Sequence, residues 1–430
     1  MSRWADIGDD AFTKRRHRQV RAITVRGERH SGTHPRLRAP LAGSLLSLLV
    51  LLSPELTLAP LNAVEPHRAA PAPIDRILEA VLPQSTRPID DRPSEPEPEP
   101  ADTAAFAAAM RAARMAGEAQ GITFAVMRDG ELYWTGADGR ARESSAAITP
   151  SDGLVIGSVT KTFVAATILQ LVEERALTLS DPVRDHLPGQ AALSPAITIR
   201  QLLDHTSGLA DLFNDTTRTG LEEHPEHAWS SAEVLDTLHA PWYEPGEGWA
   251  YANTNYFLLG LVVEEVTGST LAQELDRRFL VPLELERTRV LTAAPDDGGP
   301  LAPAWTTIFW SSGAMTASAA DLASWGDALY DGEILSDRSL AEMIELNRHD
   351  YGLGLQRIEV PGAVGYGHTG LLNTYTSVLL HLPEQDVTLA LLVNRSQVDL
   401  GAMLAAKPPG GPSLLELLGV EVPKLTVPAP

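Results

Sequence analysis

The chain has 430 residues, no cysteine and a formal net charge of −22 at pH 7. The lack of cysteine excludes disulfides, thiolate metal sites and a lipid anchor on cysteine. An acidic protein repels nucleic acid, so we exclude nucleic-acid binding. Hydrophobic residues make up 44% of the chain, which is enough to build the core of one large domain or of two.

Residues 1–40 are basic, with ten Lys and Arg against four Asp and Glu. They precede a twelve-residue apolar run from Leu41 to Leu52, which is short for a membrane span and typical of the apolar part of an export signal. We therefore interpret residues 1–63 as a basic leader with an export signal or an anchor. The expected location is extracytoplasmic: secreted, periplasmic, or tethered to a membrane through residues 41–63.

Residues 64–102 are rich in Pro, Glu and Asp and end in alternating Glu-Pro. Such a sequence cannot form a core, and charge repulsion together with polyproline geometry extends it. We expect a disordered linker there, followed by one folded domain over residues 103–406. Pro and Gly residues then break the pattern, and we interpret residues 407–430 as a C-terminal tail.

The folded domain is predicted to begin with an alanine-rich helix from Thr103, followed by a β-hairpin around Arg128-Asp129-Gly130. From Ser158 to about Asn347 the pattern is mostly helical, and strand patterns return between Tyr351 and Val393. Strands at both ends with helices between them predict an α+β fold. Its antiparallel sheet is made from both chain ends and flanked by helices.

Three short motifs carry candidate chemistry, and the first lies at the start of the helical region. Ser158 and Lys161 open a long apolar helix, where residues three apart share a face. Desolvation lowers the pKa of a buried lysine, and a neutral amine can take the proton of a serine hydroxyl. Ser-x-x-Lys is frequent by chance, and a lysine in a first turn is usually solvated. The apolar residues 163–172 favour a buried helix and therefore a catalytic pair.

Tyr251 and Asn253 form the second motif, just before another predicted helix. A phenol can relay a proton when a nearby cation lowers its pKa, and a carboxamide can hold a substrate amide by two hydrogen bonds. The third motif, His368-Thr369-Gly370, is predicted at a strand start and offers donors for a substrate carboxylate or carbonyl. Taken singly, a packed loop tyrosine and a structural histidine are the simpler interpretations.

The order and spacing of the three motifs resemble the serine β-lactamase and penicillin-binding protein superfamily. Tyr-Ala-Asn in the second place is similar to the class C β-lactamase and soluble D-Ala-D-Ala carboxypeptidase and esterase branch. Further similar segments are Ile156 to Phe163, Ile199 to Leu209, Ser318 to Trp325 and Gly365 to Gly370. The resemblance implies a β-lactamase/transpeptidase-like fold, with a mostly helical insert and an active site between the sheet part and the helical part.

By this resemblance, Ser158 is the acylated nucleophile and Lys161 is its proton acceptor. Tyr251 passes the proton to the leaving group and later activates the hydrolytic water. The backbone N–H groups of Ser158 and Leu371 form the oxyanion hole. No metal and no organic cofactor is implied.

The same resemblance makes Asn253, His368 and Thr369 substrate-binding residues, with the last two meeting a substrate carboxylate. His368 stands where many β-lactamases have lysine, which weakens the fixed positive charge for a penicillin. Residues 371–373 are bulkier than expected and narrow the predicted acyl pocket. His205 lies in a segment that the family uses as a structural turn, so we assign it no role.

These features predict an exported serine hydrolase that works through a Ser158 acyl-enzyme on peptide, amide or ester substrates. It would resemble a D-Ala-D-Ala carboxypeptidase or an esterase. The expected partner is a small-molecule or peptidoglycan-peptide substrate. The alternatives are a β-lactamase proper and a non-catalytic, penicillin-recognising scaffold protein.

Overall fold

The computed structural model describes residues 103–141, 146–187, 190, 193–292 and 300–423. All of them belong to one compact unit of the chain. The expected leader and linker, residues 1–102, lie outside the described residues. Within the described ranges, no helix is both long enough and apolar enough to cross a membrane.

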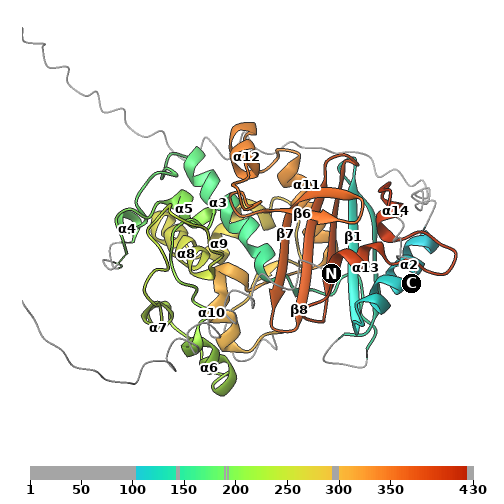
Figure 1. Cartoon of the computed structure of the whole chain (residues 1–430), viewed down its shortest axis with the longest axis horizontal. Coiled ribbons are helices and arrows are strands. Elements are labelled where there is room, and N and C mark those ends of the chain that lie inside the picture. Colours follow the sequence, from blue (N-terminus) through green and yellow to red (C-terminus); the bar gives the residue numbers. More distant parts are fainter. Residues whose placement is uncertain (1–102, 142–145, 188–189, 191–192, 293–299, 424–430) are drawn as a thin grey trace, which may run out of the picture. The chain divides into compact units, whose positions relative to one another are not determined.

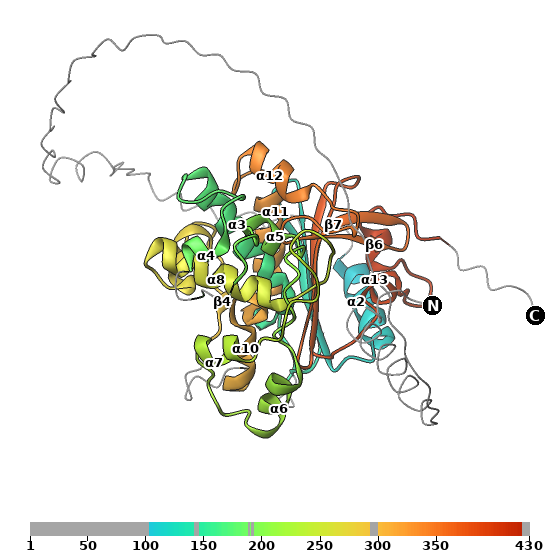
Figure 2. The ribbon, with the colours of Figure 1, turned by 60° about the vertical axis from the view of Figure 1, so that its left-hand side comes forward.

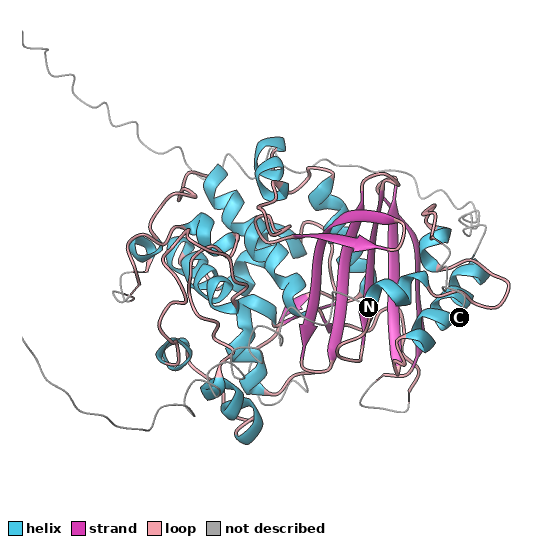
Figure 3. Ribbon diagram, in the orientation of Figure 1, coloured by secondary structure: helices cyan, strands magenta, loops and turns pink. Residues whose placement is uncertain are grey.

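A six-stranded antiparallel sheet forms the centre of this unit, in the order β2-β1-β9-β8-β7-β6 (Figures 1 and 3). Its strands are β1 (Gly121–Arg128), β2 (Glu131–Gly139), β6 (Gln356–Val360), β7 (Ala363–Leu372), β8 (Tyr375–Leu382) and β9 (Val387–Val393). β1 pairs with β9, and Ile122 lies opposite Val393. The early and late parts of the sequence therefore meet in one sheet, which confirms the predicted α+β architecture.

Both faces of the sheet are covered, which explains why β9 is apolar at nearly every position and buried along its whole length. One face carries α2 (Thr103–Ala116), α13 (Leu400–Ala405) and α14 (Leu414–Leu417) (Figure 1). Leu414 and Leu415 are fully buried there, and a capping box between Ser413 and Glu416 starts their helix. The core thus continues past residue 406, where we ended the domain from the sequence.

Between β2 and β6 the chain is mostly helical, as predicted. The helices are α3 (Thr160–Glu173), α4 (Val183–His186), α5 (Ile199–Leu203), α6 (Asp215–Glu223), α7 (Ser231–Asp236), α8 (Asn253–Thr267), α9 (Leu271–Leu275), η3 (Asp276–Leu280), α10 (Pro303–Gly313), α11 (Ala319–Tyr330) and α12 (Asp337–Ile344). Three short strands form a second sheet in the order β3-β5-β4: β3 (Leu154–Val155), β4 (Arg289–Val290) and β5 (Met315–Ala317). The helices gather on the side of the main sheet opposite α2 and α13 (Figure 2).

Helix α3 lies inside this helical part and is buried over most of its length, including Lys161 in its first turn. Its Phe163 stacks on Trp325 of α11, with ring centroids 4.0 Å apart. Helix α11 in turn lies directly on the sheet, because Gly326 leaves room for side chains of β8 and β9. The start of α3 is therefore fixed against a rigid base.

Candidate active site

Ser158 lies on a 3₁₀ turn, η2 (Gly157–Val159), between β3 and α3. Gly157 has a positive φ of 51°, and a Cβ there would stand 2.8 Å from the backbone nitrogen of Leu371. Glycine therefore lets the turn and β7 approach closely. Ser158 is partly exposed between two buried neighbours, Gly157 and Val159.

Lys161 is completely buried and lies one helical turn from the serine, as the spacing predicted. Its Nζ is 3.1 Å from Ser158 Oγ, 2.9 Å from Asn253 Oδ1 and 2.7 Å from the Ser312 carbonyl oxygen. Burial lowers the pKa of Lys161 from 10.5 to about 7, against a smaller raising influence from Asp211. Near pH 7 a large share of the molecules thus carries a neutral amine.

The hydrogen bonds also orient that neutral amine. The Ser312 carbonyl and Asn253 Oδ1 can only accept, so they take the two hydrogens of the amine. Its lone pair is then left to face the hydroxyl of Ser158. This arrangement is the one that proton transfer from serine to lysine requires.

Asp211 holds Asn253 in place, and sequence reasoning missed it. Its carboxylate accepts the backbone N–H of Asn253 at 2.8 Å and the side-chain Nδ2 at 3.3 Å. The second contact fixes the amide so that Oδ1 points to Lys161. Asn253 was expected to bind a substrate amide; in the structure its Oδ1 accepts from Lys161, and within the described residues one Nδ2 hydrogen makes no hydrogen bond. The only signal in the sequence was an acidic residue close after His-Thr-Ser-Gly.

Tyr251 adjoins the same pair, but the direction of its pKa differs from our expectation. Lys161 Nζ lies over the ring, 4.9 Å from the centroid. Burial raises the pKa of Tyr251, with the Ser158 hydroxyl as a weaker opposing influence. We expected a nearby cation to lower this pKa; the pKa is instead raised, because burial of the phenol is the largest influence on it. The raised pKa keeps Tyr251 a neutral phenol at pH 7, and the role of Lys161 as the base remains a prediction.

His368 and Thr369 lie in the middle of β7 and not at its start. His368 is 1% exposed, and its ring nitrogens contact the Tyr351 hydroxyl at 3.0 Å and the Thr369 carbonyl at 2.6 Å. Thr369 binds Gln356 Oε1 through both its hydroxyl and its backbone N–H. Neither side chain presents an unoccupied donor for the substrate carboxylate that we expected them to meet. Burial lowers the pKa of His368 to about 3, so it supplies no positive charge.

The backbone of β7 favours the predicted oxyanion hole. Pairing with β6 ends at Gly367, so the edge of β7 beyond it is left uncovered by that strand. The N–H of Thr369 points away from β8 toward Gln356, and N–H groups two residues apart on a strand point the same way. The N–H of Leu371 therefore points off that edge, toward the turn that carries Ser158. The role of the hole remains a prediction.

Of the three bulky residues after the third motif, only Leu371 is largely exposed, with 49% of its surface accessible. Leu372 is buried in the core, and Asn373 has a φ of 53° in the turn between β7 and β8. We expected all three to narrow the pocket; strand alternation turns Leu372 into the core, Asn373 lies in the turn beyond the strand, and Leu371 alone is left for that role.

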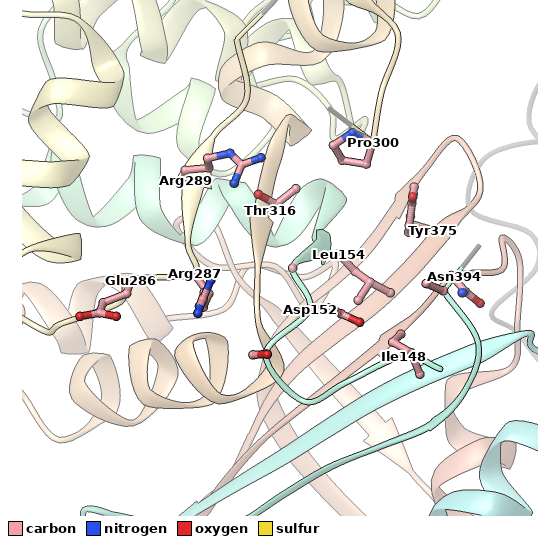
Figure 4. A pocket seen from close by; sticks show the side chains of 13 residues that line it. Ile148, Asp152, Leu154, Glu286, Arg287, Arg289, Pro300, Thr316, Tyr375 and Asn394 are labelled. Atoms are coloured by element: carbon pink, nitrogen blue, oxygen red, sulfur yellow. The ribbon is translucent and has the colours of Figure 1, made fainter. Parts of the chain in front are cut away.

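A separate cavity of about 450 Å³ is lined by residues of the small sheet and its neighbours, including Asp152, Arg287, Arg289, Tyr375 and Asn394 (Figure 4). It contains none of the residues of the site described above. Across the described part of the chain, no cluster of three or more His, Asp or Glu is placed to hold a metal ion.

Two features define the class of protein: Ser158 faces the buried amine of Lys161, and the main sheet has the strand order given above. Together they are typical of a serine hydrolase with the fold of β-lactamases and penicillin-binding proteins. The Beta-lactamase family model matches residues 106–406, and the chain belongs to that family.

Individual relatives are moderately similar. Penicillin-binding protein 4 of Amycolatopsis lactamdurans is 29% identical over 311 residues, which cover 64% of this chain and 80% of that protein. D-aminopeptidase of Brucella anthropi is 29% identical over 296 residues, which cover 64% of this chain but only 56% of that protein. The solved structure of a D-stereospecific amidohydrolase from Streptomyces sp. shares 29% identity and a TM-score of 0.60, over 70% of this chain and 98% of that one.

Proposed function

We propose that the protein hydrolyses amide bonds of small substrates through an acyl-enzyme on Ser158, with D-amino-acid amides and peptides as the preferred class. The observation that carries the proposal is the buried Lys161 amine, 3.1 Å from Ser158 Oγ. The D-aminopeptidase and the D-stereospecific amidohydrolase among its relatives support an amide substrate of D configuration.

In the acylation step, neutral Lys161 takes the proton of the Ser158 hydroxyl while Oγ bonds to the substrate carbonyl carbon. The carbonyl oxygen becomes negative and accepts hydrogen bonds from the N–H groups of Ser158 and Leu371. Loss of one such donor typically costs about 10²–10³ in rate. The C–N bond then breaks, and the leaving amine receives the proton through the phenol of Tyr251.

In the second half, water attacks the Ser158 ester. The water gives one proton to Lys161, directly or through Tyr251, and the carboxylic acid leaves as serine regains its hydrogen. Because Tyr251 stays neutral at pH 7, it relays a proton and does not act as a charged base. Each cycle therefore returns Lys161 to the neutral form.

The proposal is tested with the purified full chain and D-alanine amide, measuring ammonia release against the L enantiomer. We expect faster release from the D amide and an acyl adduct on Ser158 by mass spectrometry. Ser158→Ala should abolish both. The matched control is Ser151→Ala, because this exposed serine lies in the same segment and makes no contact with the site. Turnover that survives Ser158→Ala would overturn the mechanism.

The alternatives separate in the same assay. Hydrolysis of nitrocefin faster than of any amide or D-Ala-D-Ala peptide would identify a β-lactamase proper. Hydrolysis of a short-chain ester alone would favour an esterase. Penicillin labelling of Ser158 with no turnover of any substrate would favour a scaffold protein.

We also propose that the protein is exported and acts outside the cytoplasm. The basic leader and the apolar run at 41–52 support this proposal. Fractionation of bacteria that express the full chain, with mass spectrometry of its N-terminus, tests it. We expect extracytoplasmic protein, either cleaved near residue 63 or held on the membrane; intact chain in the cytoplasm would overturn it.

A further inference from the structure

A buried chain of hydrogen bonds links the second and third motifs, and the catalytic steps above do not use it. Its central members are His205, Tyr351 and His368, which are 0%, 2% and 1% exposed. His205 follows α5, Tyr351 precedes β6, and His368 lies on β7. Residues far apart in the sequence thus meet behind Tyr251, whose ring centroid is 4.3 Å from that of His205.

The contacts of His205 fix where its hydrogen lies. Its Nδ1 faces the backbone N–H of Ala252 at 3.3 Å and the Nδ2 of Asn255 at 2.8 Å. A backbone N–H can only donate, so Nδ1 carries no hydrogen. Ser207 donates to Asn255 Oδ1 at 2.6 Å, which agrees with that orientation of the amide. Neutral His205 therefore holds its hydrogen on Nε2, 3.2 Å from the hydroxyl of Tyr351.

The same direction of hydrogen-bond donation continues from Tyr351 to His368 in the third motif. The Tyr351 hydroxyl accepts from His205 and donates to His368 Nε2 at 3.0 Å. The Thr369 carbonyl, 2.6 Å from His368 Nδ1, can only accept, so Nδ1 carries the hydrogen. The two histidines are therefore both neutral but are opposite tautomers. Burial is the main cause that lowers the pKa of each, with the charge of Lys161 as a smaller one.

The backbone at His205 gives an independent reason to expect a role. Its φ is +63°, in the left-handed region that favours glycine and asparagine. A positive φ is uncommon for residues other than glycine, and the contacts of both ring nitrogens hold His205 in it. The contacts to Ala252 and Tyr351 need two ring nitrogens on opposite sides of one ring.

We propose that His205 is a positioning residue for the hydrolase, a proposal that rests on the function given above. Through Nδ1 it holds the backbone of Ala252, and thereby the flanking Tyr251 and Asn253. Through Tyr351 it holds His368 on β7, the strand that also carries the predicted oxyanion donor. The side chain of His205 thus fixes the position of the second motif relative to the third.

The tautomers are read by NMR of the full chain labelled with ¹⁵N-histidine, without any substrate. We expect one buried histidine with hydrogen on Nε2, assigned to His205, and one with hydrogen on Nδ1, assigned to His368. Both should stay neutral from pH 6 to pH 8. Tyr351→Phe should shift both sets of signals, whereas Tyr330→Phe should leave them unchanged. Tyr330 is the matched control, because its buried hydroxyl makes no hydrogen bond within the part of the chain that the structure describes.

The kinetic arm uses Tyr351→Phe and His205→Asn, since asparagine tolerates a positive φ and keeps the backbone relaxed. Rates are divided by the number of Ser158 sites that a covalent probe labels, so a misfolded fraction does not count. We expect kcat per site to fall about ten-fold or more, since a misplacement of about 1 Å can cost about 10² in rate. KM should change little, because neither side chain faces the opening.

The outcomes separate this inference from the proposed function. Absence of amide turnover by the unaltered chain would refute that function, whereas the NMR experiment would still report on the hydrogen bonds from His205 through Tyr351 to His368. Hydrogen on Nε2 of His368, or a charged His368 at pH 7, would overturn the assigned direction. A Tyr351→Phe variant with unchanged kcat per site would overturn the positioning role.

Discussion

Exchanging Lys161 for methionine should change how the stability of the fold depends on pH. In the unfolded chain this amine keeps its proton up to about pH 10.5, whereas in the folded chain it loses the proton above about pH 7. Between these values the unfolded state binds more protons, so stability rises with pH. Below pH 7 both states are charged and the whole cost of burying the ammonium is present. Methionine removes this dependence.

The structure sets the size of the effect. The difference between 10.5 and about 7 corresponds to about 5 kcal/mol, at about 1.4 kcal/mol for each pKa unit. Lys161 is completely buried, so solvent screening is small. The exchange also removes three hydrogen bonds, and their dependence on the charge of the amine is already contained in the folded pKa. The advantage of methionine over lysine should therefore shrink by about 1.4 kcal/mol per pH unit above pH 7.

Urea unfolding, followed by tryptophan fluorescence at pH 6.5, 8 and 9, measures this difference. Lys407→Met is the matched control, because that side chain is about half exposed (49%) and pairs with Glu416 on the surface. A stability difference for Lys161→Met that stays flat from pH 7 to pH 9 would refute the reasoning, since the folded chain would then hold a charged amine. The same variant should lose about 10²–10⁴ in acylation rate.

Three further exchanges test other parts of the structure. Gly157→Ala should lower kcat about 10²-fold, because its Cβ would press on the nitrogen of Leu371; Gly268→Ala, also at positive φ but facing open space, should leave kcat unchanged. Tyr251→Phe should lower kcat about 10²-fold or more but keep the midpoint of the acidic limb near pH 7, where Lys161 sets it; a displaced midpoint would contradict this. Burial raises the pKa of Asp327 to about 6, so its ionisation destabilises the fold as pH rises through that value. In thermal unfolding, Asp327→Asn should raise the free energy of unfolding by about 1 kcal/mol at pH 8, after discounting for partial exposure. At pH 4 the exchange should have no effect.

The local part of the site could be predicted from the sequence because it depends on one helical turn. Ser158 and Lys161 share a face through their spacing alone, and the apolar run after them predicted burial. The hairpin at 128–130 and the C-terminal strands are likewise local patterns. The sheet from both chain ends followed from the order of those patterns.

The rest depends on contacts between distant residues. Asp211 reaches Asn253, and the Ser312 carbonyl reaches Lys161, only after α3, α8 and α10 have packed. The raised pKa of Tyr251 could not be predicted because spacing does not show that the phenol hydroxyl is buried, and burial raises that pKa. His368 was expected to meet substrate, yet its neighbours Tyr351 and Thr369 occupy both of its nitrogens.

The turn at 251–253 is where these contacts converge. Asp211 holds Asn253 from one side, and His205 holds Ala252 from the other. Burial, and not a neighbouring positive charge, lowers the pKa of Lys161 to about 7, so any loosening that admits water would raise this pKa and remove the base. Keeping water away from the Lys161 amine therefore requires the segment at 251–253 to stay rigid. This explains why Asp211 and His205 both hold that segment in place.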